Sequence, residues 1–234
     1  MHKKIYSAAI LFLSLVACST DEPNPECASK DLQQVGSFET FASGQFDGLM
    51  PIESLLISAD FGIGTLDSLD GEMLVHDRRV YQFRSDGSVV SAPENVRTPF
   101  AMMCKFISDT TFSCTDADLY ATIDRIASDP QQILAIQVQG DFHSVTTASF
   151  PKQHKPYPSM QEVLSNQQVS FSIGECNGLA VGFRIPAYCA GMNQEGYHMH
   201  FISSDGTKGG HITSLSPGTV SVSIRKLQAI QMIL

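Results

Sequence analysis

Basic residues are scarce in this chain of 234 residues, which carries 15 Lys and Arg against 24 Asp and Glu and a formal net charge of -9. Nucleic-acid binding requires clustered Lys and Arg that neutralise phosphates, and the sequence has no such cluster, so no nucleic-acid partner is expected. No pair of cysteines has CxxC spacing, which argues against a metal site built from thiolates. No segment repeats with a fixed period, and the length suits one domain with a full core.

The sequence also lacks an apolar run of the roughly 20 residues that an ordinary transmembrane helix needs. The run from Ala8 to Ala17 is shorter, follows two lysines and has the size of a secretory signal. Leu15-Val16-Ala17-Cys18 resembles a bacterial lipobox, in which cleavage before the cysteine leaves Cys18 to carry lipid. We therefore predict that residues 1–18 are a lipoprotein signal peptide and that the exported protein is anchored to a membrane. An ordinary signal peptide and an uncleaved anchor are the alternatives, and without export the protein would be cytoplasmic.

Residues 19–36 are mostly polar and are expected to form a tether, which leaves residues 37–234 as the folded domain. An oxidising compartment would permit disulfides among the cysteines of that domain. The spacing allows two local pairings without deciding for either. These are Cys104 with Cys114 and Cys176 with Cys189.

Turn signals divide much of the chain into short strands. Asp70-Gly71 is expected to end one strand, which places Glu72 at the start of the next, and Asp205-Gly206 is expected to close a hairpin. The glycines at positions 62 and 64 resemble a phosphate loop, but they lack the Gly-Lys-Ser/Thr ending and a following helix, so we reject that interpretation. From residue 169 to the end of the chain the pattern is almost entirely that of strands.

Helices are expected to be few and short. Leu119 and Ile123 belong to an apolar stripe of helical spacing that Pro130 ends. Ser159 and Glu162 form a capping-box pattern that opens a second short helix. The sequence therefore predicts an α+β fold dominated by antiparallel sheet.

Three histidines are expected to meet on one face of a predicted hairpin. His198 and His200 alternate with apolar residues, so both side chains leave the same face of a strand. A turn at Asp205-Gly206 sets His211 directly opposite His200, where Cβ atoms lie roughly 4.5–5.5 Å apart. Three neutral imidazoles with an open coordination position are typical of catalytic zinc sites. The alternative is a hydrated sheet face that carries histidines without a metal.

A series of short motifs occurs in a fixed order along roughly residues 37–225. The motifs are Phe46-Asp47-Gly48, Asp60-Phe61-Gly62-Ile63-Gly64-Thr65, Leu69-Asp70-Gly71-Glu72, Thr98-Pro99-Phe100-Ala101, Lys155-Pro156-Tyr157-Pro158, Val181-Gly182-Phe183-Arg184-Ile185-Pro186-Ala187-Tyr188, Gly196-Tyr197-His198-Met199-His200-Phe201-Ile202 and Gly209-Gly210-His211. Together they closely resemble the successive motifs of the α-acetolactate decarboxylase family. The resemblance implies two linked β-rich halves and Zn²⁺ bound through His198, His200 and His211, and it places Thr65 and Glu72 at the metal.

The reaction of that family converts 2-acetolactate to acetoin and carbon dioxide. The resemblance therefore implies a zinc-dependent carboxy-lyase of acetoin biosynthesis, whose metal polarises the ketone and hydroxyl oxygens of this small substrate. Glu72 is the expected metal ligand or proton relay, and Thr65 is the second expected catalytic residue. A homodimer is also expected.

Two positions depart from the family pattern. Ala148 stands where the family carries an arginine that can bind the substrate carboxylate, and no acidic residue follows Asp205 to match the family's second metal-binding glutamate. Lys155 and Arg184 are candidates for a substitute cation. These departures leave three hypotheses: a working decarboxylase, a zinc-binding relative that acts on another small hydroxy-keto acid, and a zinc hydrolase.

Overall fold

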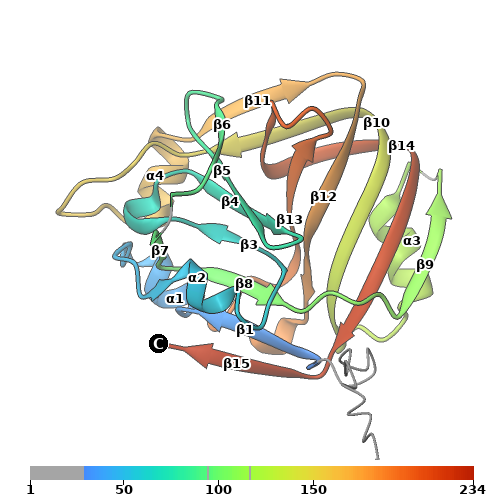
Figure 1. Ribbon diagram of the computed structural model, residues 1–234, viewed down its shortest axis with the longest axis horizontal. Coiled ribbons are helices and arrows are strands. Elements are labelled where there is room, and N and C mark those ends of the chain that lie inside the picture. Colours follow the sequence, from blue (N-terminus) through green and yellow to red (C-terminus); the bar gives the residue numbers. More distant parts are fainter. Residues whose placement is uncertain (1–28, 94, 116) are drawn as a thin grey trace, which may run out of the picture.

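Two β-sheets that pack face to face make up most of the computed structural model, which describes residues 29–93, 95–115 and 117–234 (Figure 1). The strands are β1 (Asp31–Val35), β2 (Met50–Pro51), β3 (Phe61–Thr65), β4 (Glu72–His76), β5 (Arg79–Phe83), β6 (Val89–Ser91), β7 (Arg97–Thr98), β8 (Ala101–Cys104), β9 (Thr110–Cys114), β10 (Ile133–Ser149), β11 (Val169–Ile173), β12 (Cys176–Ile185), β13 (Gly196–Ser203), β14 (Gly209–Leu227) and β15 (Ala229–Ile233). The helices are α1 (Phe38–Ala42), α2 (Ile52–Leu55), α3 (Leu119–Ile126) and α4 (Met160–Asn166), with 3₁₀ turns η2 (Asp67–Leu69) and η3 (Ala187–Cys189).

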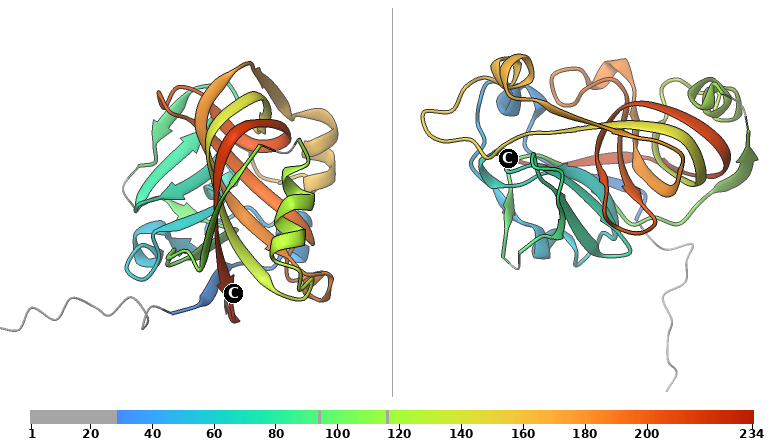
Figure 2. Two further views of the ribbon diagram at one scale, coloured as in Figure 1. Left: turned by 90° about the vertical axis from the view of Figure 1, so that its right-hand side faces the viewer. Right: turned by 90° about the horizontal axis from the view of Figure 1, so that it is seen from above.

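The first sheet has the strand order β15-β1-β8-β3-β4-β5-β6, and the second has the order β11-β10-β12-β13-β14-β9. β1 and β15 run parallel, whereas the pairs that build the second sheet are antiparallel. β10 also pairs with β14, so the cycle β10-β12-β13-β14 closes on itself. Figure 2 shows the long strands β10 and β14 curving together. The predicted α+β fold, with two linked β-rich halves and a few short helices, is confirmed.

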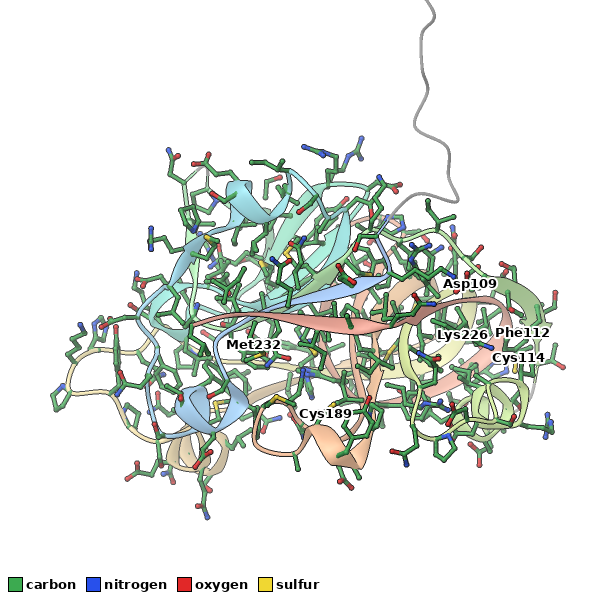
Figure 3. The ribbon with its side chains drawn as sticks, turned by 90° about the horizontal axis from the view of Figure 1, so that it is seen from below. Asp109, Phe112, Cys114, Cys189, Lys226 and Met232 are labelled. Carbon is green, nitrogen blue, oxygen red and sulfur yellow. The ribbon has the colours of Figure 1, made fainter. Side chains whose placement is uncertain are left out.

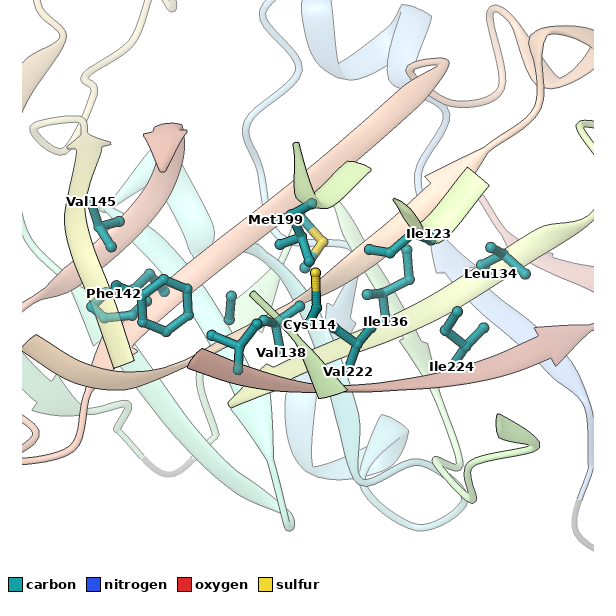
Figure 4. Packing of buried hydrophobic residues seen from close by; sticks show 14 of the residues in the cluster. Cys114, Ile123, Leu134, Ile136, Val138, Phe142, Val145, Met199, Val222 and Ile224 are labelled. Atoms are coloured by element: carbon teal, nitrogen blue, oxygen red, sulfur yellow. The ribbon is translucent and has the colours of Figure 1, made fainter. Parts of the chain in front are cut away.

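Apolar side chains form one core on each face of the second sheet. Leu119 and Ile123 of α3 pack with Met199 and Phe201 of β13 on the face that is turned away from the first sheet. Figure 4 labels Ile123 and Met199 in this cluster. The other core lies between the sheets and includes Ile202 of β13. Because side chains of a strand alternate, β13 buries Met199 and Phe201 on one face and presents His198 and His200 to the first sheet.

Both predicted helices are present. Asp118 caps α3 by accepting a hydrogen bond from the backbone N–H of Ala121. Ser159 and Glu162 form the expected capping box at the start of α4. Within the described residues no helix is long and apolar enough to span a membrane.

We expected residues 19–36 to form a tether. The later part of this segment forms β1, which lies between β15 and β8. Leu32, Gln34 and Val35 are fully buried there. The Gln34 amide nitrogen donates to the carbonyls of Gly36 and Met192, so hydrogen bonds satisfy a side chain that the polar pattern assigned to solvent. The folded part therefore begins before residue 37. The predicted signal peptide with Cys18, and residues 19–28 of the expected tether, lie outside the described residues.

The described cysteines do not form the disulfides that the spacing allowed. Cys104, Cys176 and Cys189 are free thiols, and Cys114 forms no disulfide with any of them. β8 and β9, which carry the first pair, belong to different sheets. In the second pair, Cys176 is the first residue of the long strand β12 and Cys189 follows its other end. Figure 3 shows Cys114 at the end of β9 and Cys189 at the end of η3. The two cysteines of each pair are therefore near each other in the sequence but lie in different parts of the fold.

The connection between β3 and β4 is longer than the tight turn that we expected at Asp70-Gly71. β3 ends at Thr65, and η2 fills the connection before Glu72 opens β4. Thr65 nevertheless pairs directly with Glu72, so both side chains lie on one face of the first sheet. The position predicted for Glu72 at the start of a strand is confirmed.

Candidate metal centre and its pocket

The hairpin of β13 and β14 brings the three histidines together as its sequence predicts. His200 pairs directly with His211, and His198 lies two residues away on the same face of β13. One potential ligand atom from each imidazole lies within 4.8 Å of the other two. This spacing allows the three rings to bind a single cation.

A backbone hydrogen bond fixes the tautomer of His200. Its Nδ1 lies 2.8 Å from the carbonyl oxygen of Met73 on β4, and because a carbonyl only accepts, Nδ1 carries the proton. Nε2 then has a free lone pair, and this buried nitrogen has no hydrogen-bond partner among the described residues. A buried nitrogen of this kind suits metal binding, since metal-bound histidines usually donate their other N–H to an oxygen.

Burial keeps the three imidazoles neutral. It lowers the pKa values of His198 and His200 well below their usual range, with a smaller contribution from the neighbouring histidines. It also lowers the pKa of His211 to about 4. The metal-binding form of histidine is the neutral form, so this environment holds the ligands ready at neutral pH.

Glu72 and Thr65 complete the polar part of the site from the first sheet. Oε2 of Glu72 lies 3.5 Å from Nε2 of His200, and burial raises the pKa of the Glu72 carboxyl well above its usual value. The hydroxyl of Thr65 donates to the carbonyl of Gly71, which fixes its orientation. The site thus contains a carboxyl group able to hold a proton next to the histidines.

A pocket of about 320 Å³ connects this centre to the surface. His198, His211, Thr65 and Glu72 line its polar part. The remaining wall is mostly aromatic and aliphatic and comes from α1, α4, η2, the residue before β8 and the residue after β10. No Lys or Arg within the described ranges is among the lining residues.

The structure separates both candidate substitute cations from the pocket. Nζ of Lys155 lies 2.7 Å from a carboxylate oxygen of Asp47 on the surface. Arg184 is buried elsewhere, where its guanidinium donates to the Asp124 carboxylate at 2.7 Å and to backbone carbonyls at the end of α3. Neither residue supplies the positive charge that Ala148 lacks.

Ala148 lies beside the metal centre. It pairs directly with His211 across β10 and β14, so both side chains leave the same face of the sheet. Its side chain is fully buried. The position where the family pattern has an arginine therefore adjoins the histidines but carries no charge.

The sequence of the chain is similar to that of a known protein family. The sequence model of the family described as alpha-acetolactate decarboxylase matches residues 32–234. The chain belongs to this family. A relative from Methanosarcina mazei named alpha-acetolactate decarboxylase is 38% identical over 192 residues, which cover 80% of this chain and 66% of the relative. One of the same name from Klebsiella aerogenes is 36% identical over 77% of this chain and 71% of its own length.

The fold agrees with a solved member of the family. The crystal structure of alpha-acetolactate decarboxylase from Bacillus subtilis strain 168 superposes with a TM-score of 0.84 and 30% identity, covering 87% of this chain and 88% of that one. The present chain spans just under two thirds of the length of the relative from Methanosarcina mazei. Family membership follows from these matches.

Sequence reasoning did not find the groups that shape the site around the histidines. Met73 acts through its backbone carbonyl, which no side-chain pattern reveals. Phe41 and Phe150 reach the same pocket although more than a hundred positions separate them in sequence. Phe100 lies in one of the family motifs, but that motif did not indicate a pocket wall. The capping box predicted α4 without indicating that Leu164 lines the pocket.

The metal-free protein should lose stability as the pH falls from about 6.5 towards 4. In this range the unfolded chain takes up protons on three histidines that the folded protein keeps neutral, so the free energy of unfolding falls by about 1.4 kcal/mol per pH unit for each net proton. Glu72 acts in the opposite direction, because its pKa is raised in the folded state, but it is one group against three.

Urea unfolding in the presence of a chelator at several pH values measures this dependence. His198→Gln should flatten it, whereas His143→Gln at an exposed position should leave it unchanged. A stability that is independent of pH over this range would contradict the buried neutral state of the histidines.

Proposed function

We propose that the protein is a zinc-dependent carboxy-lyase that converts 2-acetolactate to acetoin. The observation that carries the proposal is the convergence of three neutral imidazoles on one point beside a buried carboxyl group at a pocket. The names of the relatives support the reaction type. Histidine nitrogens and an open position suit Zn²⁺, which is the metal we propose.

The departing carbon dioxide leaves an electron pair that moves towards the ketone oxygen of the substrate. Zinc bound at the histidines would supply the Lewis acid that stabilises this negative charge. His198, His200 and His211 hold that position, and the carbonyl of Met73 keeps the His200 nitrogen directed inward. The apolar wall limits the access of water, so that proton transfer depends on groups of the protein.

Glu72 is the group that we propose delivers the proton. Its carboxyl lies at the inner end of the pocket, and burial favours its protonated form. Acetoin forms when the carbon that lost carbon dioxide receives a proton on one face. Thr65, paired with Glu72 on the same face of the sheet, is proposed to orient the substrate through its hydroxyl oxygen.

A second candidate function rests on the environment of Ala148. The pocket has no cationic side chain among the described residues, and a bidentate arginine contact to a carboxylate is not replaced by a neutral group without loss. A zinc-binding relative that acts on another small hydroxy-keto acid is therefore the alternative. The two candidates share the metal centre and differ in the substrate.

Glu72→Gln should lower kcat for acetoin release by about 10²–10⁴-fold, because the amide cannot deliver the proton. Zinc-loaded protein and racemic acetolactate provide the assay, with acetoin measured above the uncatalysed rate. Glu175→Gln, an exposed position after β11, is the matched control and should retain full activity. Wild-type protein that holds zinc but forms no acetoin would favour the second candidate function.

We also propose that the protein is exported and anchored to a membrane through lipid on Cys18. The support is the short apolar run after two lysines and the Leu-Val-Ala-Cys sequence. In bacterial cells fed a labelled fatty acid, Cys18→Ser should abolish incorporation into the protein and Cys27→Ser should not. Label that persists in Cys18→Ser, or that is absent from the wild type, would exclude lipidation at this residue.

A further inference from the structure

The wall of the pocket is a rigid aromatic surface. The rings of Phe41 and Phe100 stack with centroids 5.2 Å apart and an interplanar angle of 23°. Phe41, Phe100 and Phe150 are at most 6% exposed and belong to one buried cluster with Leu69. All four residues line the pocket. The apolar surface is therefore fixed by packing before any ligand binds.

Residues of α4 extend this surface to the mouth. Met160 and Leu164 are four positions apart on the helix, so their side chains lie on one face, and both line the pocket. Leu164 is 46% exposed, although large apolar side chains gain by being covered. A ligand in the pocket would contact the part of this side chain that faces inward.

The pocket is large for 2-acetolactate. Its volume of about 320 Å³ reaches the lower end of the range of roughly 300–1,000 Å³ that is common for sites of drug-sized ligands. Acetolactate has only two methyl groups to cover the aromatic wall once its polar end is held at the histidines. The more exposed apolar lining, from Phe38, Met160 and Leu164, would then remain in contact with water.

The polar lining offers little additional binding energy to a small acid. Outside the metal centre it consists of Gln168, Gln194 and Thr213, all of them neutral. With no Lys or Arg along the described part of the pocket to pair with a carboxylate, apolar contact is the main source of affinity besides the metal centre.

We propose that the pocket selects 2-hydroxy-3-keto acids in which an aryl or branched alkyl group replaces the methyl group on the ketone of acetolactate. Phe41, Phe100 and Phe150 form the specificity-determining wall, and Leu164 covers the outer end of the substituent. The inference rests on the proposed function, because the polar end of the substrate and the reaction are those of acetolactate. Only the size and apolar character of one substituent differ.

Binding of two unreactive ligands tests this selection. 2,3-Dihydroxy-2-methylbutanoate carries the methyl group, and 2,3-dihydroxy-2-methyl-3-phenylpropanoate carries a phenyl group at the same place. Neither has a ketone to accept electrons, so neither decarboxylates. Calorimetry with the zinc-loaded full-length chain should give a Kd at least about tenfold lower for the phenyl ligand.

Two matched variants locate the preference. Leu164→Ala should weaken binding of the phenyl ligand by roughly three- to tenfold and leave the methyl ligand unchanged. Ile126→Ala removes a side chain of similar exposure, 44%, from α3 away from the pocket and should change neither Kd. Because Leu164 and Ile126 are both partly exposed on short helices, both variants should fold.

Equal affinities, a preference for the methyl ligand, or a phenyl preference that Leu164→Ala leaves unchanged would overturn the inference. Acetoin release from acetolactate by the same preparation separates this result from failure of the proposed function. If acetoin forms while the methyl ligand binds more tightly, only the inference fails. If neither ligand binds and neither acetolactate nor its phenyl analogue is decarboxylated, both fail.

Discussion

The pairing of His200 with His211 is the constraint on which the rest of the site depends. It is set by the short connection between β13 and β14 and by the burial of Met199 and Phe201 on the opposite face of β13. A shift of one residue in this register would turn the histidines towards the apolar core and the apolar side chains towards the pocket. The hydrophobic core thus enforces the geometry of the metal centre.

The metal centre also links the two sheets. β13 and β14 of the second sheet provide the imidazoles, whereas β4 of the first sheet provides the Met73 carbonyl and the Glu72 carboxyl. Packing between the sheets removes water from all of these groups, and this burial shifts the histidines and the glutamate towards their neutral forms. Burial therefore favours the neutral form of both the metal-binding histidines and the proposed proton donor Glu72.

Local patterns predicted the parts of this molecule in which neighbouring residues decide the structure. Alternation on β13, the Asp205-Gly206 turn and the capping box of α4 gave the hairpin, the convergence of the histidines and the second helix. The buried position of β1 was not predictable in this way, because Gln34 looks polar until its hydrogen-bond partners from the distant segment around Met192 are known. A contact between residues so far apart in the sequence cannot be predicted from the pattern of a short segment.

The same limit applies to the pocket. The aromatic wall combines residues from α1, from the segment before β8 and from the segment after β10, and only the closed fold brings them together. Family motifs indicated Thr65 and Glu72, which the structure pairs on adjacent strands. They did not indicate that Lys155 and Arg184 are held in other ion pairs, which leaves the region beside Ala148 without positive charge.

The most direct test of the account is the zinc content of the purified protein, measured by elemental analysis after chelation and reloading. The wild type should bind one equivalent of zinc per chain, His200→Gln and His211→Gln should bind less than stoichiometric amounts, and His143→Gln should bind as the wild type does. A wild-type protein that takes up no zinc, or variants of His200 and His211 that retain it fully, would contradict a cation site built from these imidazoles.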